Sequence, residues 1–249
     1  SLAIGVVASR HRPLVDEAVA SLERAMAAAP SARLAPEEVS GLPDVWQEEL
    51  AHVVAGAGPR DEGLSQAAAV LEARVHELPS WRFGWIPSRP SGLGWLTYLF
   101  VHTELLHLLA NLVLFWFVAT TLEVRVGPER TSAVFLVAGA AGAGAHLMLH
   151  GASTVPLVGA SASVAGVLGA LLVHRPPARL PFVFLWGRGP RASGARLHIP
   201  LVAILLLWVG LETLAWVEPS AAPTALGAHL GGLVAGGALG RALGSPQSP

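Results

Sequence analysis

The sequence predicts an all-α protein, a polytopic bundle of transmembrane helices with a small helical segment at its N-terminal end. Of the 249 residues, 53% are hydrophobic and 13% are charged, and the mean hydropathy is +0.55, which is unlike a soluble chain. Apolar stretches of near-spanning length follow residue 95, and arginines gather in alternate connections between them. These stretches must be helices, because hydrocarbon offers the backbone of a single segment no other hydrogen-bonding partner.

Five membrane spans are predicted, since a span needs about 20 mostly apolar residues. They are 96–119, 132–149, 157–173, 198–217 and 225–243. Residues 96–243 therefore form the expected transmembrane domain, and 244–249 form a short tail. Residues 81–95 contain Trp81, Trp85 and Trp95, as an aromatic belt at a membrane surface does, and we expect them to be an interfacial linker.

The first 80 residues differ in character from the rest. They hold 12 acidic residues against 6 arginines, whereas residues 81–249 hold 5 acidic residues against 10 arginines. Apolar residues recur at helical spacing in Leu14 to Ala29, Val39 to Val54 and Leu64 to Leu78, and none of these stretches is apolar enough to span a bilayer. We expect residues 1–80 to be an acidic, amphipathic-helical segment outside the membrane. Because residue 1 is Ser, we also expect that the chain is trimmed at its start and that an upstream helix is absent.

The arginine distribution predicts the orientation, since short loops rich in arginine stay on the cytoplasmic side. The connection after the first span carries Arg125 and Arg130, and the connection after the third carries five arginines. The connections at 151–156 and 218–224 carry none. We therefore expect a multi-pass protein of the bacterial cytoplasmic membrane, with residues 1–80 outside and the C-terminus in the cytoplasm.

Composition excludes several kinds of chemistry. A net charge of -1 gives no basic surplus for binding nucleic acid. The absence of cysteine removes disulfides, thiolate catalysis and Cys-based metal sites, and the absence of lysine removes Schiff-base and Ser-Lys chemistry. The available nucleophiles are Ser, Thr, Asp, Glu and His.

A strongly polar side chain inside a predicted span is costly and is a functional candidate by default, and four such residues matter most. They are His107, Asn111, Ser161 and His229. His107 and Asn111 are four residues apart and share one helix face, about 40° apart. Taken one at a time, each could instead link helices through an interhelical hydrogen bond.

Together these residues suffice for acyl transfer. A serine hydroxyl becomes a good nucleophile when histidine takes its proton. The amide of Asn111, the ring of His107 and the backbone N–H of Ser161 could stabilise the oxyanion, and Gly159 allows close approach of the backbone. No metal and no cofactor is needed.

The sequence offers two alternatives at the site. Ser163 is a rival nucleophile, but two helical positions differ by about 200°, so Ser161 and Ser163 cannot both face His229, and Ser161 is favoured. His102 and His107 resemble a zinc-protease pair, but they are five residues apart, whereas that motif requires a separation of four.

The order of the motifs resembles that of rhomboid intramembrane serine proteases. The chain has His107-x-x-x-Asn111, then Gly159-Ala-Ser161 a span later, then Ala228-His-Leu-Gly-Gly-x-x-x-Gly236, over about residues 95–243. The resemblance implies a rhomboid-like bundle lacking the usual first span, with Ser161 as nucleophile, His229 as base, and His107, Asn111 and Gly159 on the oxyanion side. It also implies that Gly232 and Gly236 let the last helix approach the nucleophile's helix, and that the substrates are single-pass transmembrane proteins in the lipid bilayer.

The chain departs from the family pattern at two positions near the nucleophile. Ala162 stands where the family usually has glycine, and Ala165 stands where an aromatic residue often stacks on the base. Neither change removes a reacting group.

Two alternative functions stay open. The first is a catalytically inactive rhomboid-like protein that binds transmembrane helices. The second is a small transporter or channel, which is less favoured because the sequence shows no internal repeat.

Overall fold

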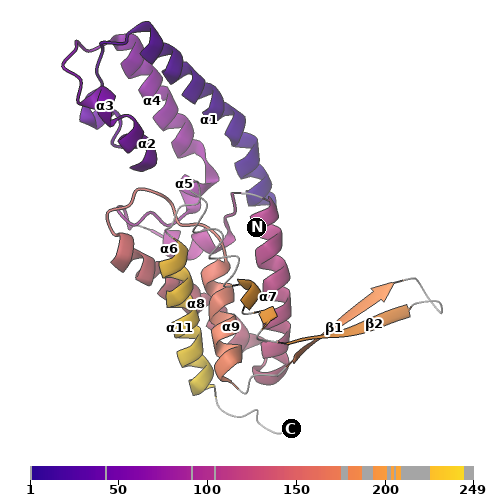
Figure 1. Ribbon diagram of the computed structural model, residues 1–249. Helices are drawn as coiled ribbons and strands as arrows, with labels where there is room; N and C mark the ends of the chain where they lie inside the picture. The colour runs from indigo at the N-terminus through magenta and orange to yellow at the C-terminus, as the bar shows by residue number, and fades with distance from the viewer. Residues whose placement is uncertain are drawn as a thin grey trace. The chain divides into compact units, whose positions relative to one another are not determined.

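A computed structural model describes residues 2–42, 44–90, 92–103, 105–174, 179–186, 193–200, 203–204, 206–208 and 225–243 (Figure 1). The chain divides into two compact units. The first comprises Ser1–Ala110 with Leu147–Ala160, and the second comprises Asn111–His146 with Ser161–Pro249.

The first unit begins with a set of short and long helices. Its N-terminal helices are α1 (Leu2–Ala28), the 3₁₀ helix η1 (Pro36–Glu38), α2 (Asp44–Glu49), α3 (Ala51–Val54), α4 (Glu62–Glu77) and α5 (Pro79–Phe83). The predicted helix at 64–78 corresponds to α4. The predicted helix at 14–29 is part of the longer α1, and the one at 39–54 is divided into α2 and α3, which are separated at Leu50.

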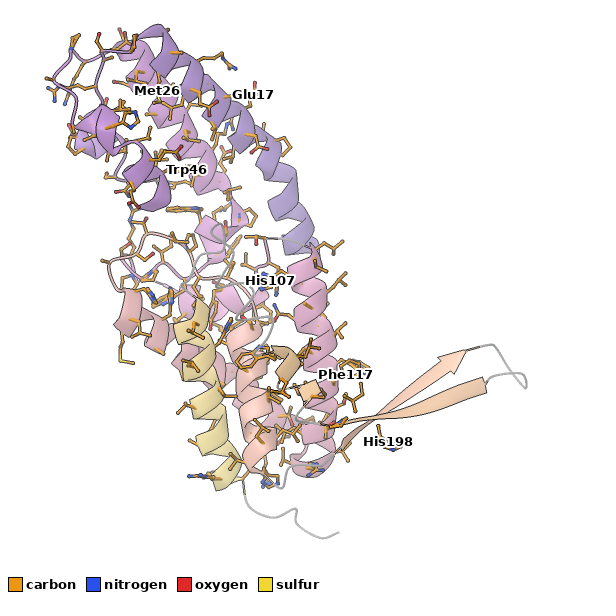
Figure 2. The ribbon with its side chains drawn as sticks, in the orientation of Figure 1. Glu17, Met26, Trp46, His107, Phe117 and His198 are labelled. Atoms are coloured by element: carbon orange, nitrogen blue, oxygen red, sulfur yellow. The ribbon has the colours of Figure 1, made fainter. Side chains whose placement is uncertain are left out.

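The helices α1 and α4 pack side by side around an apolar core (Figure 1). Leu34, Leu42, Leu64 and Ala68 have no exposed surface, and burying a leucine contributes about 1.5–3 kcal/mol. Met26 and Trp46 pack against the same core (Figure 2). The amphipathic spacing of this segment thus produces a small hydrophobic core.

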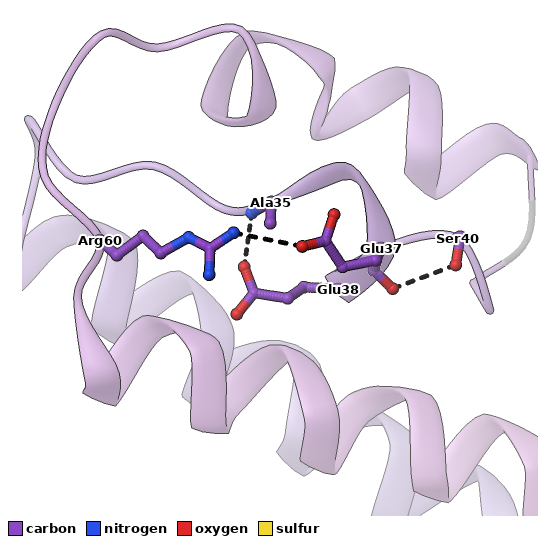
Figure 3. A network of polar contacts seen from close by, with 5 residues as sticks. All are labelled: Ala35, Glu37, Glu38, Ser40 and Arg60. Carbon is purple, nitrogen blue, oxygen red and sulfur yellow. Dashed lines mark hydrogen bonds and ion pairs between the residues drawn. The ribbon is translucent and has the colours of Figure 1, made fainter.

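Polar contacts hold the start of η1 (Figure 3). The backbone N–H of Ala35 donates to the carboxylate of Glu38, and Arg60 pairs with Glu37 at 3.2 Å. The pKa of Glu38 is lowered, first by that backbone hydrogen bond and then by a hydrogen bond from Ser65 and the charges of Arg60 and Arg33. The ionised carboxylate therefore stabilises the unpaired donors at the N-terminal end of this turn.

The rest of the first unit joins the N-terminal helices to the residues that precede Ser161. Helix α6 (Gly94–Thr97) and the 3₁₀ helix η2 (Tyr98–Phe100) follow α5. The backbones of Trp85 and Leu157 exchange two hydrogen bonds, of 3.0 and 2.8 Å, and the hydroxyl of Thr154 donates to the carbonyl of Leu42 at 3.3 Å. The loop that leads into Ser161 is therefore held by residues from the N-terminal part of the chain.

Two helices among the described residues are long and apolar enough to cross a membrane. They are α7 (Leu105–Val126) and α8 (Pro128–His150). In the most apolar stretches of these helices 28% and 33% of the residues are buried, so most residues of both stretches are at least partly exposed. The core helix of a soluble protein would be mostly buried, whereas a helix that contacts lipid exposes such side chains.

The other predicted spans correspond less closely to the described helices. The first predicted span, 96–119, is wrong at its start, because α6, η2 and a loop precede α7. The third span corresponds to α9 (Ser161–Val173), which has only 13 residues, and the fifth to α11 (Ala225–Ala242), which has 18. Most of the fourth predicted span, 198–217, lies outside the described residues.

The second unit also contains a β-hairpin, which corrects the prediction of a wholly helical chain. Strands β1 (Arg179–Trp186) and β2 (Ser193–Pro200) pair antiparallel, with Arg179 opposite Pro200 and Trp186 opposite Ser193 (Figure 1). This segment was expected to be an arginine-rich loop. Its run Phe-Val-Phe-Leu-Trp at 182–186 is rich in β-branched and aromatic residues, which favour strands.

Candidate active site

Ser161 is the first residue of α9 and is half-buried. The first backbone N–H groups of a helix have no partner within the helix, so donors are available beside its hydroxyl. Gly159, two residues earlier, has φ of +105°, a conformation that side chains disfavour, and its N–H donates to the carbonyl of Tyr98 at 2.9 Å. Gly159 thus shapes the turn into α9, and its N–H is engaged with Tyr98.

His229 lies in the first half of α11 and is 5% exposed. Its Nε2 is 2.6 Å from the Oγ of Ser161, a distance typical of a short hydrogen bond. Two polar residues that are 68 positions apart in the chain are thus brought together on neighbouring helices. A hydroxyl in contact with an imidazole nitrogen has the geometry that proton transfer requires.

Glycines on α11, which place no side chain against α9, explain why α9 and α11 can lie so close (Figure 1). A methyl group at Gly232 would overlap the carbonyl oxygen of Ala162, and one at Gly236 would overlap the carbonyl oxygen of Gly166. One turn further, a methyl group at Gly240 would lie 2.6 Å from the carbonyl oxygen of Ala170. The backbones of the two helices are therefore in direct contact at these glycines.

The helix α8 provides space for the unusual Ala162. A side-chain carbon at Gly142 would lie only 2.7 Å from the methyl group of Ala162. That methyl group is 1% exposed and occupies the space left by the missing side chain of Gly142. The substitution of the family's glycine by Ala162 is thus matched by a glycine on the neighbouring helix.

The sequence did not single out Trp208 or the role of His174. The rings of Trp208 and His229 are 6.0 Å apart between centroids and inclined at 63°. Nδ1 of His174, just after α9, lies 3.2 Å from the carbonyl oxygen of Gly240. The absence of an aromatic residue at Ala165 could have directed attention to Trp208, whereas no sequence signal pairs His174 with α11.

The proposed oxyanion residues lie on α7. Asn111 belongs to the second unit and is 8% exposed. His107, which Figure 2 labels, belongs to the first unit. Its ring lies 5.1 Å from that of His102 in an edge-to-face arrangement. Their role toward Ser161, like that of Gly159, stays a prediction.

Ser163, the rival nucleophile, is placed differently from Ser161. Its side chain has no exposed surface, and its hydroxyl finds no hydrogen-bond partner among the described residues. Ser161, by contrast, is half-buried and contacts His229. The structure brings Ser161 and His229 together.

Comparison with known proteins gives one family. A profile described as Rhomboid domain matches residues 89–246, which include every candidate site residue. A protein named Rhomboid protease GlpG from Salmonella paratyphi A is 27% identical over 147 residues, which is 58% of this chain and 46% of that protein. Its counterpart from Salmonella choleraesuis is 28% identical over the same lengths. The chain thus spans about half the length of the curated relatives it matches, and no solved structure gives a significant match.

Two glycines of α11 provide a matched test of the helix contact. A methyl group at Gly232 would meet backbone, whereas one at Gly237 would make only ordinary contacts, of 3.6 and 3.7 Å. Both alanine substitutions gain the same helix propensity, about 1 kcal/mol. We expect Gly232→Ala to lower the thermal midpoint in detergent and to slow labelling by a fluorophosphonate at least tenfold, because overpacking costs about 1–3 kcal/mol and moves His229. Gly237→Ala should keep both properties, and equal behaviour of the two variants would contradict the packing account.

Proposed function

Because this chain belongs to the rhomboid family, we propose that it is an intramembrane serine endopeptidase with Ser161 as nucleophile and His229 as general base. The observation that carries the proposal is the 2.6 Å approach of His229 Nε2 to Ser161 Oγ. The match over residues 89–246 and the likeness to proteins named rhomboid protease support the same activity. No metal or cofactor enters the reaction as proposed.

The reaction proceeds by acyl transfer. Ser161 Oγ attacks the carbonyl carbon of the scissile peptide bond as its proton passes to His229 Nε2. The tetrahedral intermediate collapses, the C–N bond breaks, and the leaving amine takes the proton from His229. Water then attacks the acyl-serine ester with His229 again as base, which releases the carboxylic acid and restores the hydroxyl of Ser161.

The negative oxygen of the intermediate needs hydrogen-bond donors already in place. We assign this role to the backbone N–H of Ser161 at the start of α9, with the side chains of Asn111 and His107 from α7. In a site that excludes bulk water each such donor is worth about 2.7–4 kcal/mol in the transition state. Gly159 supports this arrangement by setting the backbone turn that precedes Ser161.

The length of α9 sets the depth of the reaction in the membrane. Its 13 residues reach about 20 Å, against about 30 Å for the hydrocarbon core. Residues Ala162 to Leu171 are all buried by protein, so this helix need not reach both membrane surfaces. The arginine-rich segment after α9 puts the end of this helix at the cytoplasmic boundary of the hydrocarbon. The difference between the two lengths then puts Ser161 about 10 Å below the outer boundary.

A site at this depth favours single-pass transmembrane proteins as substrates. A helix holds its carbonyl groups in hydrogen bonds to residues four positions on, so the segment to be cut must first become extended. Glycine or proline lowers the cost of unwinding, by about 1 kcal/mol for glycine and about 3 kcal/mol for proline relative to alanine. We propose substrates with such residues near their outer end, cut beside a small side chain.

The proposed orientation places the loop at 151–156 outside a bacterial cytoplasmic membrane and the C-terminus in the cytoplasm. Because the chain has no cysteine, Ala152→Cys and Ala242→Cys each introduce a unique thiol at an exposed position. A membrane-impermeant maleimide should label Ala152→Cys in intact spheroplasts, and Ala242→Cys only after permeabilisation. The reverse pattern would contradict the orientation and the depth assigned to Ser161.

Variants of the two serines test the catalytic assignment. In proteoliposomes containing a single-pass reporter with a Gly-Pro pair in its transmembrane segment, we expect Ser161→Ala and His229→Ala to reduce cleavage at least about a thousandfold. Ser163→Ala, two residues away, should cleave within about twofold of the wild type, because it removes only a buried hydroxyl without a partner among the described residues. If Ser161→Ala cleaved normally and Ser163→Ala did not, the nucleophile would be wrongly assigned. No cleavage by the wild type of any such reporter would favour an inactive helix-binding relative.

The reporter itself tests the unwinding requirement. Replacing its Gly-Pro pair with Leu-Leu should slow cleavage at least tenfold, since the unwinding cost rises by several kcal/mol. Binding to the Ser161→Ala protein should change little. Leucine substitutions near the cytoplasmic end of the same reporter serve as the control and should leave the rate unchanged. Equal cleavage of all three reporters would show that helix unwinding does not limit the reaction.

A further inference from the structure

Trp208 faces inward from a helical stretch whose neighbouring side chains face outward. It is 9% exposed, whereas Leu206 and Leu207 are 65% and 63% exposed. Its ring meets the ring of His229 with centroids 6.0 Å apart and planes at 63°. This falls within the edge-to-face geometry that aromatic pairs prefer, with centroids about 4.5–7 Å apart.

Several positions near His229 on the two helices that carry the dyad are small. On α11 the neighbours of His229 include Ala228, Gly231 and Gly232, which are small because the backbones of α8 and α9 lie against them. On α9 the position one turn after Ser161 is Ala165, which ends in a methyl group. The close helix contact that brings Ser161 to His229 thus requires small residues at these positions.

We propose that Trp208 is the positioning residue of the general base: its indole packs edge-to-face with the imidazole of His229 and keeps Nε2 directed at Ser161 Oγ. This inference rests on the proposed function. In it Trp208 takes the place of an aromatic side chain at Ala165 and acts from a different segment of the chain. In this role Trp208 acts through His229 and not on the scissile bond itself.

Loss of the indole would affect the chemical step more than substrate binding. The imidazole would then lose one of the contacts that fix its direction, and misplacement of a reacting group by about 1 Å costs roughly a hundredfold in rate. Since Trp208 acts through the base, kcat should fall while KM stays nearly constant. A purely structural role would instead lower the amount of folded protein without changing the rate of each folded molecule.

The test compares Trp208→Leu, which keeps apolar volume, with Trp208→Phe, which keeps an aromatic ring. Trp116→Leu on α7 is the matched control, because that indole is 68% exposed. The readouts are kcat and KM on the transmembrane reporter, the rate of fluorophosphonate labelling, and the thermal midpoint. Rates are divided by the fraction of molecules labelled at the end point, so that unfolded molecules do not contribute.

We expect Trp208→Leu to lower kcat and the labelling rate at least tenfold while KM stays within twofold of the wild type. The rates of Trp208→Phe should stay within threefold of the wild type, and those of Trp116→Leu should match it. Equal rates for the Leu and Phe variants, whether both high or both low, would overturn the inference. If Trp208→Leu does not fold, Trp208→Met takes its place under the same criteria. Failure of the wild type to label at all would refute the proposed function, which separates that outcome from failure of the inference.

Discussion

Direct backbone contact between α9 and α11 is the constraint on which the candidate site depends. It exists because Gly232 and Gly236 place no side chain against the carbonyl groups of Ala162 and Gly166. In hydrocarbon there is no hydrophobic force to press helices together, so close packing of small residues has a larger share in their association. The 2.6 Å contact between Ser161 and His229 follows from this packing. The same packing keeps Gly231 and Gly232 beside His229 free of side chains, and the ring of Trp208 meets the imidazole edge-to-face.

The contact between the two polar residues also makes their burial tolerable. A hydroxyl or an imidazole without a partner in an apolar bundle would cost several kcal/mol, whereas each satisfies the other here. The low local dielectric strengthens that interaction and any donor aimed at a developing oxyanion. A half-buried position at the start of a short helix, followed by buried residues from Ala162 to Leu171, therefore serves both stability and the proposed reaction. The loop before it is fixed independently, through the paired backbones of Trp85 and Leu157.

Sequence reasoning identified the features that depend on spacing within one segment. The cost of polar residues in apolar stretches pointed to Ser161 and His229, and the four-residue spacing of Gly232 and Gly236 indicated a close helix contact. Features that depend on a second segment were missed, since periodicity gives the apolar face of a helix but not its partner. The contact of Trp208 with His229 and the match of Ala162 with Gly142 are of this kind. The hairpin of β1 and β2 was missed because its arginines suggested a loop, although its apolar run suited a strand.

The central claim is that Ser161 is the nucleophile activated by His229. Its most direct test is to react the wild-type protein in detergent with a fluorophosphonate and to locate the modified serine by mass spectrometry of its peptides. The account predicts a single phosphonylated residue, Ser161. An adduct on Ser163 or on any other serine, or a folded protein that carries no adduct, would contradict it.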